Sequence, residues 1–157
     1  MSEETVLKLA ATQLKHSTII NIGNELSDAM LANLRDLILS QINEYHNKYV
    51  ILILSGLKFM DSDEYSSLLQ ISKMAEILGA KTVFVGLNPG IIMHLINQDI
   101  DIQGIKSYHI FNDALEALGI IDNSKEDNNS ELLTSEDKEN NTEIQANIDH
   151  QPFLEKS

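Results

Sequence analysis

Apolar residues follow two different spacings in this chain, and the two spacings alternate along its first 121 residues. Continuous β-rich runs occupy "STIINI" at 17–22, "YVILIL" at 49–54 and "KTVFVG" at 81–86. Between these runs, apolar residues recur every three or four positions, which is the period of an amphipathic helix. The alternation predicts an α/β fold in which helices pack on a mostly parallel, mixed sheet with right-handed crossovers.

The individual segments predict the order β-β-α-β-α-β-α-β-α, with four to five strands and about four helices. A hairpin is expected from "TVLKLA" at 5–10 and the run at 17–22. Helices are expected within 23–48, from the turn at 61–64 up to Gly79, within 87–99 and within 111–120. The short run "SYHI" at 107–110 is typical of an edge strand.

Polar residues mark where these helices begin. Ser27 is expected to cap the first helix, and Asn88 the third, with Pro89 at the first helical position. For the second helix, Ser62 is favoured as the cap and Asp61 competes with it. The last helix is expected to have Asn112 or Asp113 near its cap.

Composition changes at Ile121. Residues 122–157 hold ten acidic and three basic side chains, so this segment carries −7 of the net charge of −13. A segment so poor in apolar residues cannot offset the entropy cost of ordering. We therefore expect one domain at 1–121 and a disordered acidic tail at 122–157. The tail is interpreted as solubilising, and "QPFLEKS" at 151–157 offers the alternative of a binding peptide.

The net negative charge argues against several kinds of partner. A net charge of −13 argues against nucleic acid and against anionic membrane surfaces, because both require clustered Lys and Arg. The start "MSEETVLKLA" lacks a basic leader followed by an apolar segment. No apolar run approaches the roughly 20 residues of a membrane helix. A cytoplasmic protein is expected.

Motifs of catalysis and cofactor binding are missing from the sequence. It has no phosphate-binding P-loop, no G-x-S-x-G elbow, no Cys and no zinc-ligand spacing among its five His residues. His94 falls inside a predicted helix and is interpreted as a packing or surface residue. Asp61, Asp63 and Glu64 suggest magnesium, but acidic residues are also favourable in the first turn of any helix. We expect a non-enzymatic protein with no cofactor and no metal.

The stretch "LKFMDSDEY" at 57–65 is the candidate site, because it connects the most apolar strand to a helix at the edge of the sheet where functional groups gather. A response-regulator receiver would use Asp61 as its phosphate acceptor. Such a domain also needs paired acids after its first strand and a late Lys, which this sequence lacks. Ser62 has two interpretations, a helix cap or a phosphate acceptor at the positive end of the helix dipole. The neighbouring acids oppose a phosphate, and the residues alone leave both interpretations open.

Three pieces of the chain together resemble the STAS domain (sulfate transporter and anti-sigma factor antagonist), in particular its stressosome branch. They are "MDS" at 60–62, "LGAKTVFVGLNPGII" at 78–92 and "INIGNELSD" at 20–28. The resemblance covers residues 5 to 120 and implies a single STAS domain. Two departures are the charges of Asp63 and Glu64 after the acceptor position, and the acidic tail.

The resemblance implies a partner-switching protein that binds a serine/threonine switch kinase or an anti-sigma factor. Phosphorylation at Ser62 would release the partner, and a phosphatase would reset the switch. Paralogues bearing sensor domains would be further partners in a large assembly, and an assembly subunit that is never modified remains an alternative. The expected partner-binding residues surround Ser62 and are Asp61, Asp63, Glu64, Gly56, Met60, Asn24 and Ser27.

Overall fold

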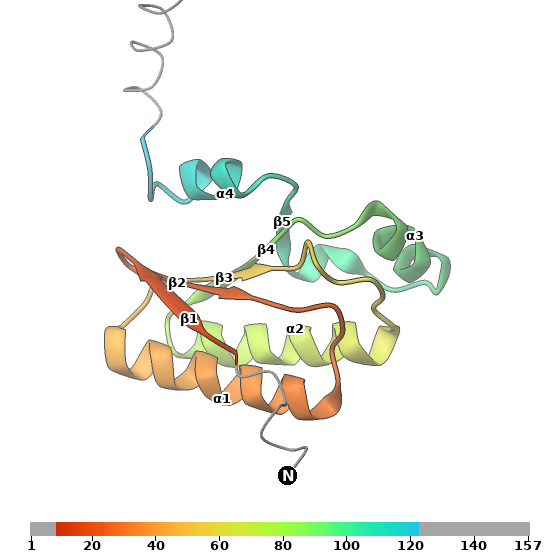
Figure 1. Ribbon diagram of the computed structural model, residues 1–157, viewed down its shortest axis with the longest axis horizontal. Helices are drawn as coiled ribbons and strands as arrows, with labels where there is room; N and C mark the ends of the chain where they lie inside the picture. The colour runs from red at the N-terminus through yellow and green to blue at the C-terminus, as the bar shows by residue number, and fades with distance from the viewer. Residues whose placement is uncertain (1–8, 123–157) are drawn as a thin grey trace, which may run out of the picture. The chain divides into compact units, whose positions relative to one another are not determined.

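The most apolar strand lies at the centre of the sheet. In this computed structural model, which describes residues 9–122, β3 (Tyr49–Ile53) pairs in parallel with β2 (Ser17–Asn21) and β4 (Lys81–Val85). β1 (Ala11–Leu14) runs antiparallel to β2, and β5 (Lys106–Tyr108) runs parallel to β4. The order β1-β2-β3-β4-β5 confirms the predicted mixed, mostly parallel sheet (Figure 1).

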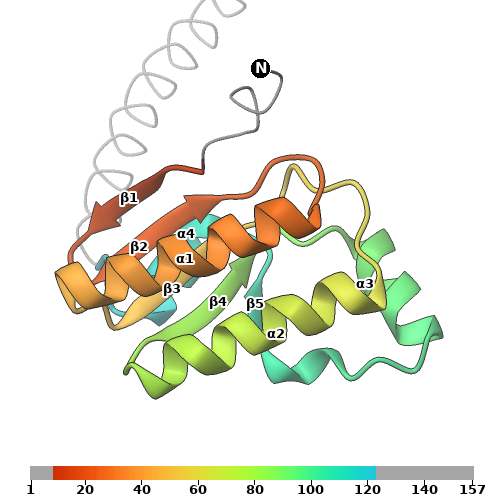
Figure 2. The same cartoon turned by 90° about the horizontal axis from the view of Figure 1, so that it is seen from below.

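The helices lie in three places around the sheet (Figures 1 and 2). α1 (Asp28–Tyr45) and α2 (Ser62–Ile77) lie side by side on one face, and the short α4 (Phe111–Ala117) lies on the other. α3 (Pro89–Asn97) sits beyond the end of the sheet and leads to the 3-10 helix η2 (Ile102–Gly104), which the sequence pattern did not predict. The predicted alternation and the four α-helices are confirmed.

Side-chain alternation along β3 gives the sheet two apolar faces. Val50 and Leu52 belong to the main core with Leu34 and Ile38 of α1, and all four are at most 1% exposed. Ile51 points to the opposite face, where α4 supplies its own buried residues, Ala114 and Leu115. A strand that is buried on both faces has a continuous apolar sequence, and the position of β3 was predictable for this reason.

The first strand differs from its prediction. It was expected at 5–10, but β1 spans Ala11–Leu14; Leu9 and Ala10 precede it, and residues 5–8 lie outside the described range. The two-residue turn at Lys15 and His16 sets the register between β1 and β2. Leu14 pairs with Ser17 across this turn, and the pairing then extends to Ala11 with Ile20. Lys15 adopts a left-handed conformation (φ 53°) that such a tight turn requires.

Two expectations about the end of the chain have different outcomes. Asn112 and Asp113 lie near the cap of α4, as expected, and the N-cap itself is Ile110, which makes no side-chain capping hydrogen bond. Apart from Asp122, the predicted acidic tail lies outside the described residues. Within residues 9–122, no helix is both long enough and apolar enough to span a membrane.

Candidate functional site

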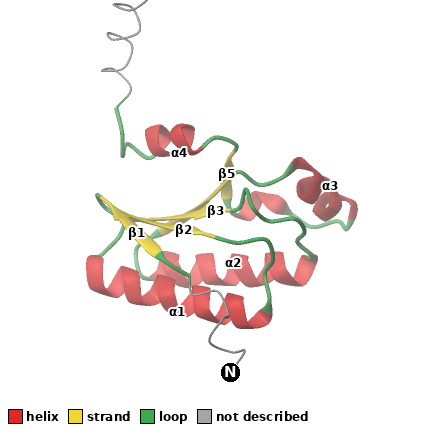
Figure 3. Cartoon of the chain, viewed as in Figure 1, coloured by secondary structure: helices red, strands yellow, loops and turns green. Residues whose placement is uncertain are grey.

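The segment between β3 and α2 is fixed by two buried side chains. Leu57 is 2% exposed and Met60 is fully buried, so both belong to the core. The Leu57 N–H donates to the Leu54 carbonyl (3.0 Å), and the Lys58 N–H donates to the Asn24 carbonyl (3.2 Å). The second bond ties this segment to the loop that precedes α1. In Figure 3 both loops lie at the same end of the sheet, close to α3.

Two reciprocal hydrogen bonds form the start of α2. The Glu64 N–H donates to Asp61 Oδ1 (2.8 Å), and the Asp61 N–H donates to Glu64 Oε2 (2.9 Å). This capping box makes Asp61 the N-cap and Ser62 the first helical residue. The favoured assignment of Ser62 as the cap is therefore wrong. A Ser62 cap would have its partner position at Tyr65, whereas Asp61 has an acid at the required spacing.

Ser62 is left without a structural task. Its side chain is partly exposed, and among residues 9–122 its hydroxyl makes no hydrogen bond. It lies at the helix end where backbone N–H groups are unpaired and the dipole is positive.

The three acids around Ser62 do not have the same role. Asp61 and Glu64 are partly buried, and each accepts a hydrogen bond from the other's backbone. Asp61 was the competing candidate for the cap, and the role of Glu64 was not foreseen. Asp63 is exposed, and no ion pair joins it to another of the described residues. Asp63 is thus the acid of this turn that is free to contact a partner.

The other predicted partner-binding residues fall into two groups. Asn24, Ser27 and Gly56 are exposed at the same edge as Ser62. A Cβ on Gly56 would lie 3.5 Å from the Gly23 carbonyl oxygen, which shows how closely the two loops approach. Ser27 is also the confirmed cap of α1, since its Oγ accepts from the Met30 N–H (3.2 Å). Met60 is fully buried, so its assignment to the partner surface is wrong.

Exposed apolar side chains beside the turn were missed by sequence reasoning. The ring of Phe59 is 54% exposed and contacts the ring of His94 on α3, with centroids 5.2 Å apart. Met93 and Ile96, also on α3, are exposed to 57% and 46%. The sequence signal was an aromatic residue in a loop three positions before Ser62. The contact agrees with the expected packing role of His94.

The geometry around Asp61 bears on the two alternatives, a magnesium site and a receiver domain. Within residues 9–122, no group of three or more His, Asp or Glu side chains is placed to hold a metal ion. The Asp61 carboxylate accepts a hydrogen bond from the Glu64 N–H in the first turn of α2. The side chains of Asp61 and Glu64 are therefore engaged in starting the helix.

Tyr65 anchors the start of α2 in the core. It is 2% exposed, and its hydroxyl oxygen is buried without a hydrogen-bond partner in the described part of the chain. Burial raises the pKa of this hydroxyl, and the negative charge of Asp101 raises the pKa further. The neutral side chain is therefore favoured in the folded state.

The capping box predicts a contrast between two neighbouring alanine variants. Asp61→Ala removes the acceptor for the Glu64 N–H and should lower the free energy of unfolding by about 1 kcal/mol. Ser62→Ala removes no bond and should change it by less than about 0.5 kcal/mol. Urea unfolding followed by circular dichroism measures both. Equal losses would show that Ser62 shares the capping role.

Tyr65 predicts a specific alkaline loss of stability. Above the ordinary tyrosine pKa of about 10, the unfolded chain loses the Tyr65 proton while the folded chain retains it. The free energy of unfolding should therefore fall as pH rises from about 10 to the raised folded pKa. Tyr65→Phe should remove this component, while the other three tyrosines titrate in both proteins. Urea unfolding at several pH values checks it, and parallel curves for the two proteins would contradict it.

Solved structures with the same fold share low sequence identity with this chain. RsbS from Moorella thermoacetica, in a serine-to-glutamate variant, is 21% identical with a TM-score of 0.60, covering 73% of this chain and all of that one. A chain of the stressosome, described as a signal integration and transduction hub, is 23% identical with a TM-score of 0.59, covering 71% of this chain and 100% of that one.

The anti-sigma factor antagonist SpoIIAA matches in two states. Its unphosphorylated form is 18% identical with a TM-score of 0.55, covering 72% of this chain and 99% of that chain. The phosphorylated form from Bacillus is 15% identical with a TM-score of 0.53, covering 70% and 98%. No curated protein sequence matches this chain. Residues 8–115 match the family model of the STAS domain, and the chain therefore belongs to the STAS domain family.

Proposed function

We propose that this protein is a non-enzymatic, cytoplasmic partner-switching regulator controlled by phosphorylation of Ser62. In its unmodified form it binds a serine/threonine switch kinase or an anti-sigma factor. The observation that carries the proposal is that the residues that cap α2 are different from the residue proposed to be modified. Asp61 and Glu64 form the cap, while Ser62 is partly exposed and its hydroxyl makes no hydrogen bond to another of residues 9–122. The hydroxyl can thus be modified without removing a bond that holds the fold.

The effect of the phosphate is electrostatic. It would add a charge close to −2 next to Asp63, in a turn where the described residues place no ion pair. A dianion enclosed in an interface without a matching cation loses its hydration and repels nearby acids. The complex with the partner would then dissociate while the domain stays folded.

The docking surface proposed for the partner is the edge of the sheet around Ser62. Exposed Asn24 and Gly56 lie on the two loops joined by the Lys58–Asn24 hydrogen bond, and Asp63 lies in the first turn of α2. Phe59 adds an apolar, aromatic contact of the kind that anchors interfaces. This surface combines one aromatic anchor with polar groups close to the modified hydroxyl.

Relatives of the same fold support this mechanism. SpoIIAA adopts the matching fold in both its phosphorylated and unphosphorylated forms. The RsbS structure carries glutamate in place of a serine, a substitution that adds negative charge. The likeness to a chain of the stressosome, a signal integration and transduction hub, supports a role in signal transduction. The proposal adds paralogues with sensor domains as further partners and a phosphatase that resets the switch. An assembly subunit that is never modified is the alternative that the next experiment separates.

Phosphorylation is tested by intact-mass measurement after incubation with ATP and the cognate switch kinase. The wild-type chain should gain one phosphoryl group, and Ser62→Ala should gain none. Ser66→Ala and Ser67→Ala are matched controls in the same helix and should still gain one. A gain that persists in Ser62→Ala overturns the assignment, and a magnesium-dependent gain lost in Asp61→Asn identifies a receiver instead. No gain in the wild type favours the unmodified subunit.

Ser62→Asp tests the consequence of added charge. It should weaken binding to the switch kinase by about tenfold or more, because an unpaired charge would be enclosed in the interface. Its circular dichroism spectrum should match that of the wild type. Ser66→Asp places the same charge on an exposed position one turn further along α2 and should bind nearly as well as the wild type. Isothermal titration calorimetry measures both affinities, and equal losses would contradict a specific role for Ser62.

A further inference from the structure

Basic side chains gather at the edge of the sheet opposite Ser62. Because β2 to β5 run parallel, their amino ends lie at one edge of the sheet, and their carboxyl ends, with the turn to α2, lie at the other. Each of these four strands begins with a basic residue or directly follows one, and all of these side chains are exposed. The basic edge consists of Lys15 and His16 before β2, Lys48 before β3, Lys81 at the start of β4 and Lys106 at the start of β5.

Backbone hydrogen bonds hold the middle of the basic edge together. The Lys48 N–H donates to the His16 carbonyl (2.7 Å), and the Lys81 N–H donates to the Lys48 carbonyl (2.9 Å). Neighbouring strands are about 4.8 Å apart, so three successive strand starts lie within about 10 Å of one another. The sheet therefore fixes the spacing of these residues, and only their side chains have to adapt to a ligand.

The charge of the basic edge is only partly offset by its surroundings. Among residues 9–122, no ion pair engages Lys48, Lys81 or Lys106. Two acids, Glu44 and Glu76, lie in the last turns of α1 and α2, and Glu76 lines a cavity of about 220 Å³ together with Lys81 and Lys106. The edge holds four lysines, so a surplus of positive charge remains at neutral pH.

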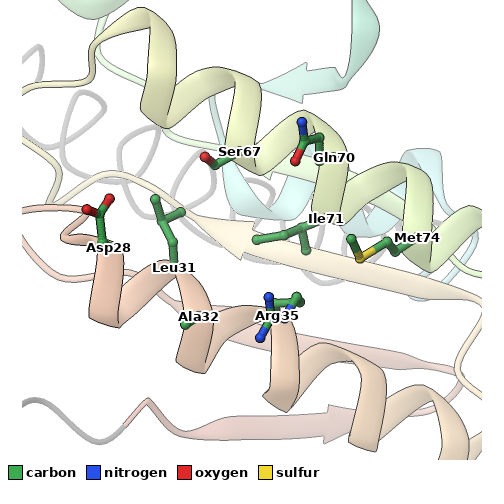
Figure 4. Close-up of a pocket in the computed structure, with 8 residues that line it drawn as sticks. All are labelled: Asp28, Leu31, Ala32, Arg35, Ser67, Gln70, Ile71 and Met74. Atoms are coloured by element: carbon green, nitrogen blue, oxygen red, sulfur yellow. The ribbon is translucent and has the colours of Figure 1, made fainter.

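The other cations of the described residues lie away from this edge. Lys58 is in the loop before α2, and Lys73 is on α2 itself. Arg35 lines the groove between α1 and α2 and pairs with Asp36 (Figure 4). Residues 9–122 contain seven Lys and Arg against thirteen Asp and Glu, and four of the seven are in the basic edge. The edge is thus a local cationic surface on an acidic domain.

The acidic tail begins beside this surface. The Lys15 Nζ donates to the Ile120 carbonyl, so the last residues before the tail are held next to the basic edge. The first four acids of the tail are at positions 122, 126, 127 and 131, all within eleven residues of Ile120. Eleven residues span at most about 40 Å, which is well beyond the width of the basic edge. The chain is therefore long enough to bring several carboxylates to the lysines.

We propose that the acidic tail at 122–157 binds the basic edge of its own domain. The tail carries a net charge of −7, and the edge supplies the matching cations. One exposed ion pair contributes little free energy, because water screens it. Several pairs act together here, and the covalent connection keeps the carboxylates at an effective concentration in the millimolar range near the lysines.

The acids around Ser62 direct the tail away from the opposite edge. Asp61, Asp63 and Glu64 give that edge the same sign of charge as the tail. The five residues of β3, at about 3.3 Å each, separate the two edges by about 16 Å. This distance is about twice the screening length of 8 Å at 0.15 M salt. A tail bound at the basic edge leaves the surface around Ser62 uncovered, and the proposal does not depend on modification of Ser62.

A paramagnetic label tests the contact in the full chain. The sequence has no Cys, so Ser135→Cys provides a single attachment site for a nitroxide label in the tail. At about 0.1 M salt, where the screening length is about 10 Å, the label should broaden the backbone amide NMR signals of His16, Lys48 and Lys81. The signal of Asp63 should keep its intensity. At about 1 M salt, where the screening length falls to about 3 Å, the broadening should be lost.

Paired charge reversals and a mixing experiment identify the contact. Lys48→Glu combined with Lys81→Glu should abolish the broadening. Lys58→Glu combined with Lys73→Glu makes the same change of charge at exposed positions outside the basic edge and should retain it. Amide spectra of the unlabelled variants should show that both remain folded. A mixture of nitroxide-labelled protein with separate ¹⁵N-labelled protein should show no broadening, because the contact lies within one chain.

Four results would each overturn the proposal. They are the absence of broadening at the basic edge, equal broadening at Asp63, broadening that persists in the Lys48 and Lys81 variant, and broadening in the mixture, which would identify the tail of a second copy as the ligand. None of these results bears on whether Ser62 accepts a phosphate, so the two proposals fail independently.

Discussion

The reciprocal hydrogen bonds between Asp61 and Glu64 are the constraint on which the candidate site depends. They satisfy two backbone N–H groups at the start of α2 and fix the point at which the chain turns from loop into helix. Because the cap uses residues on both sides of Ser62, this serine is held in place without contributing a bond itself. The proposed switch requires one side chain to hold the fold and one to change its charge. Here the two tasks fall on different side chains.

The packing around the cap also separates residues that hold the fold from residues that reach the surface. Met60 and Tyr65 lie on either side of the capping box and reach the core, at 0% and 2% exposure. The residues between them, from Asp61 to Glu64, are the ones that reach solvent. A phosphate on Ser62 would therefore act on the surface while the helix start stays anchored at two points.

The sequence predicted the elements that repeat a simple period, and it missed those fixed by geometry alone. β3 and α1 were predictable because continuous and helical apolar patterns have few competing explanations. β1 was misplaced because its residues, "ATQL", carry no apolar pattern and owe their pairing to the turn at Lys15. The Ser62 assignment failed because several residues near a helix start are good caps, and only the reciprocal bond from Glu64 distinguishes Asp61. Met60 was assigned to the partner surface as part of the motif "MDS" at 60–62, yet its side chain is fully buried.

The acidity of the turn also limits how release can work in the proposed switch. A partner that accepts exposed Asp63 in its interface must already offer hydrogen-bond donors or a cation there. A phosphate on Ser62 adds oxygens that compete for those same groups, one residue away. Donors that satisfy one carboxylate cannot also satisfy a dianion, so the new charge stays without partners inside the interface. Under this argument Asp63 does not imitate the phosphate. It uses up the donors that would otherwise stabilise the phosphate, and so it sharpens the difference between the bound and released states.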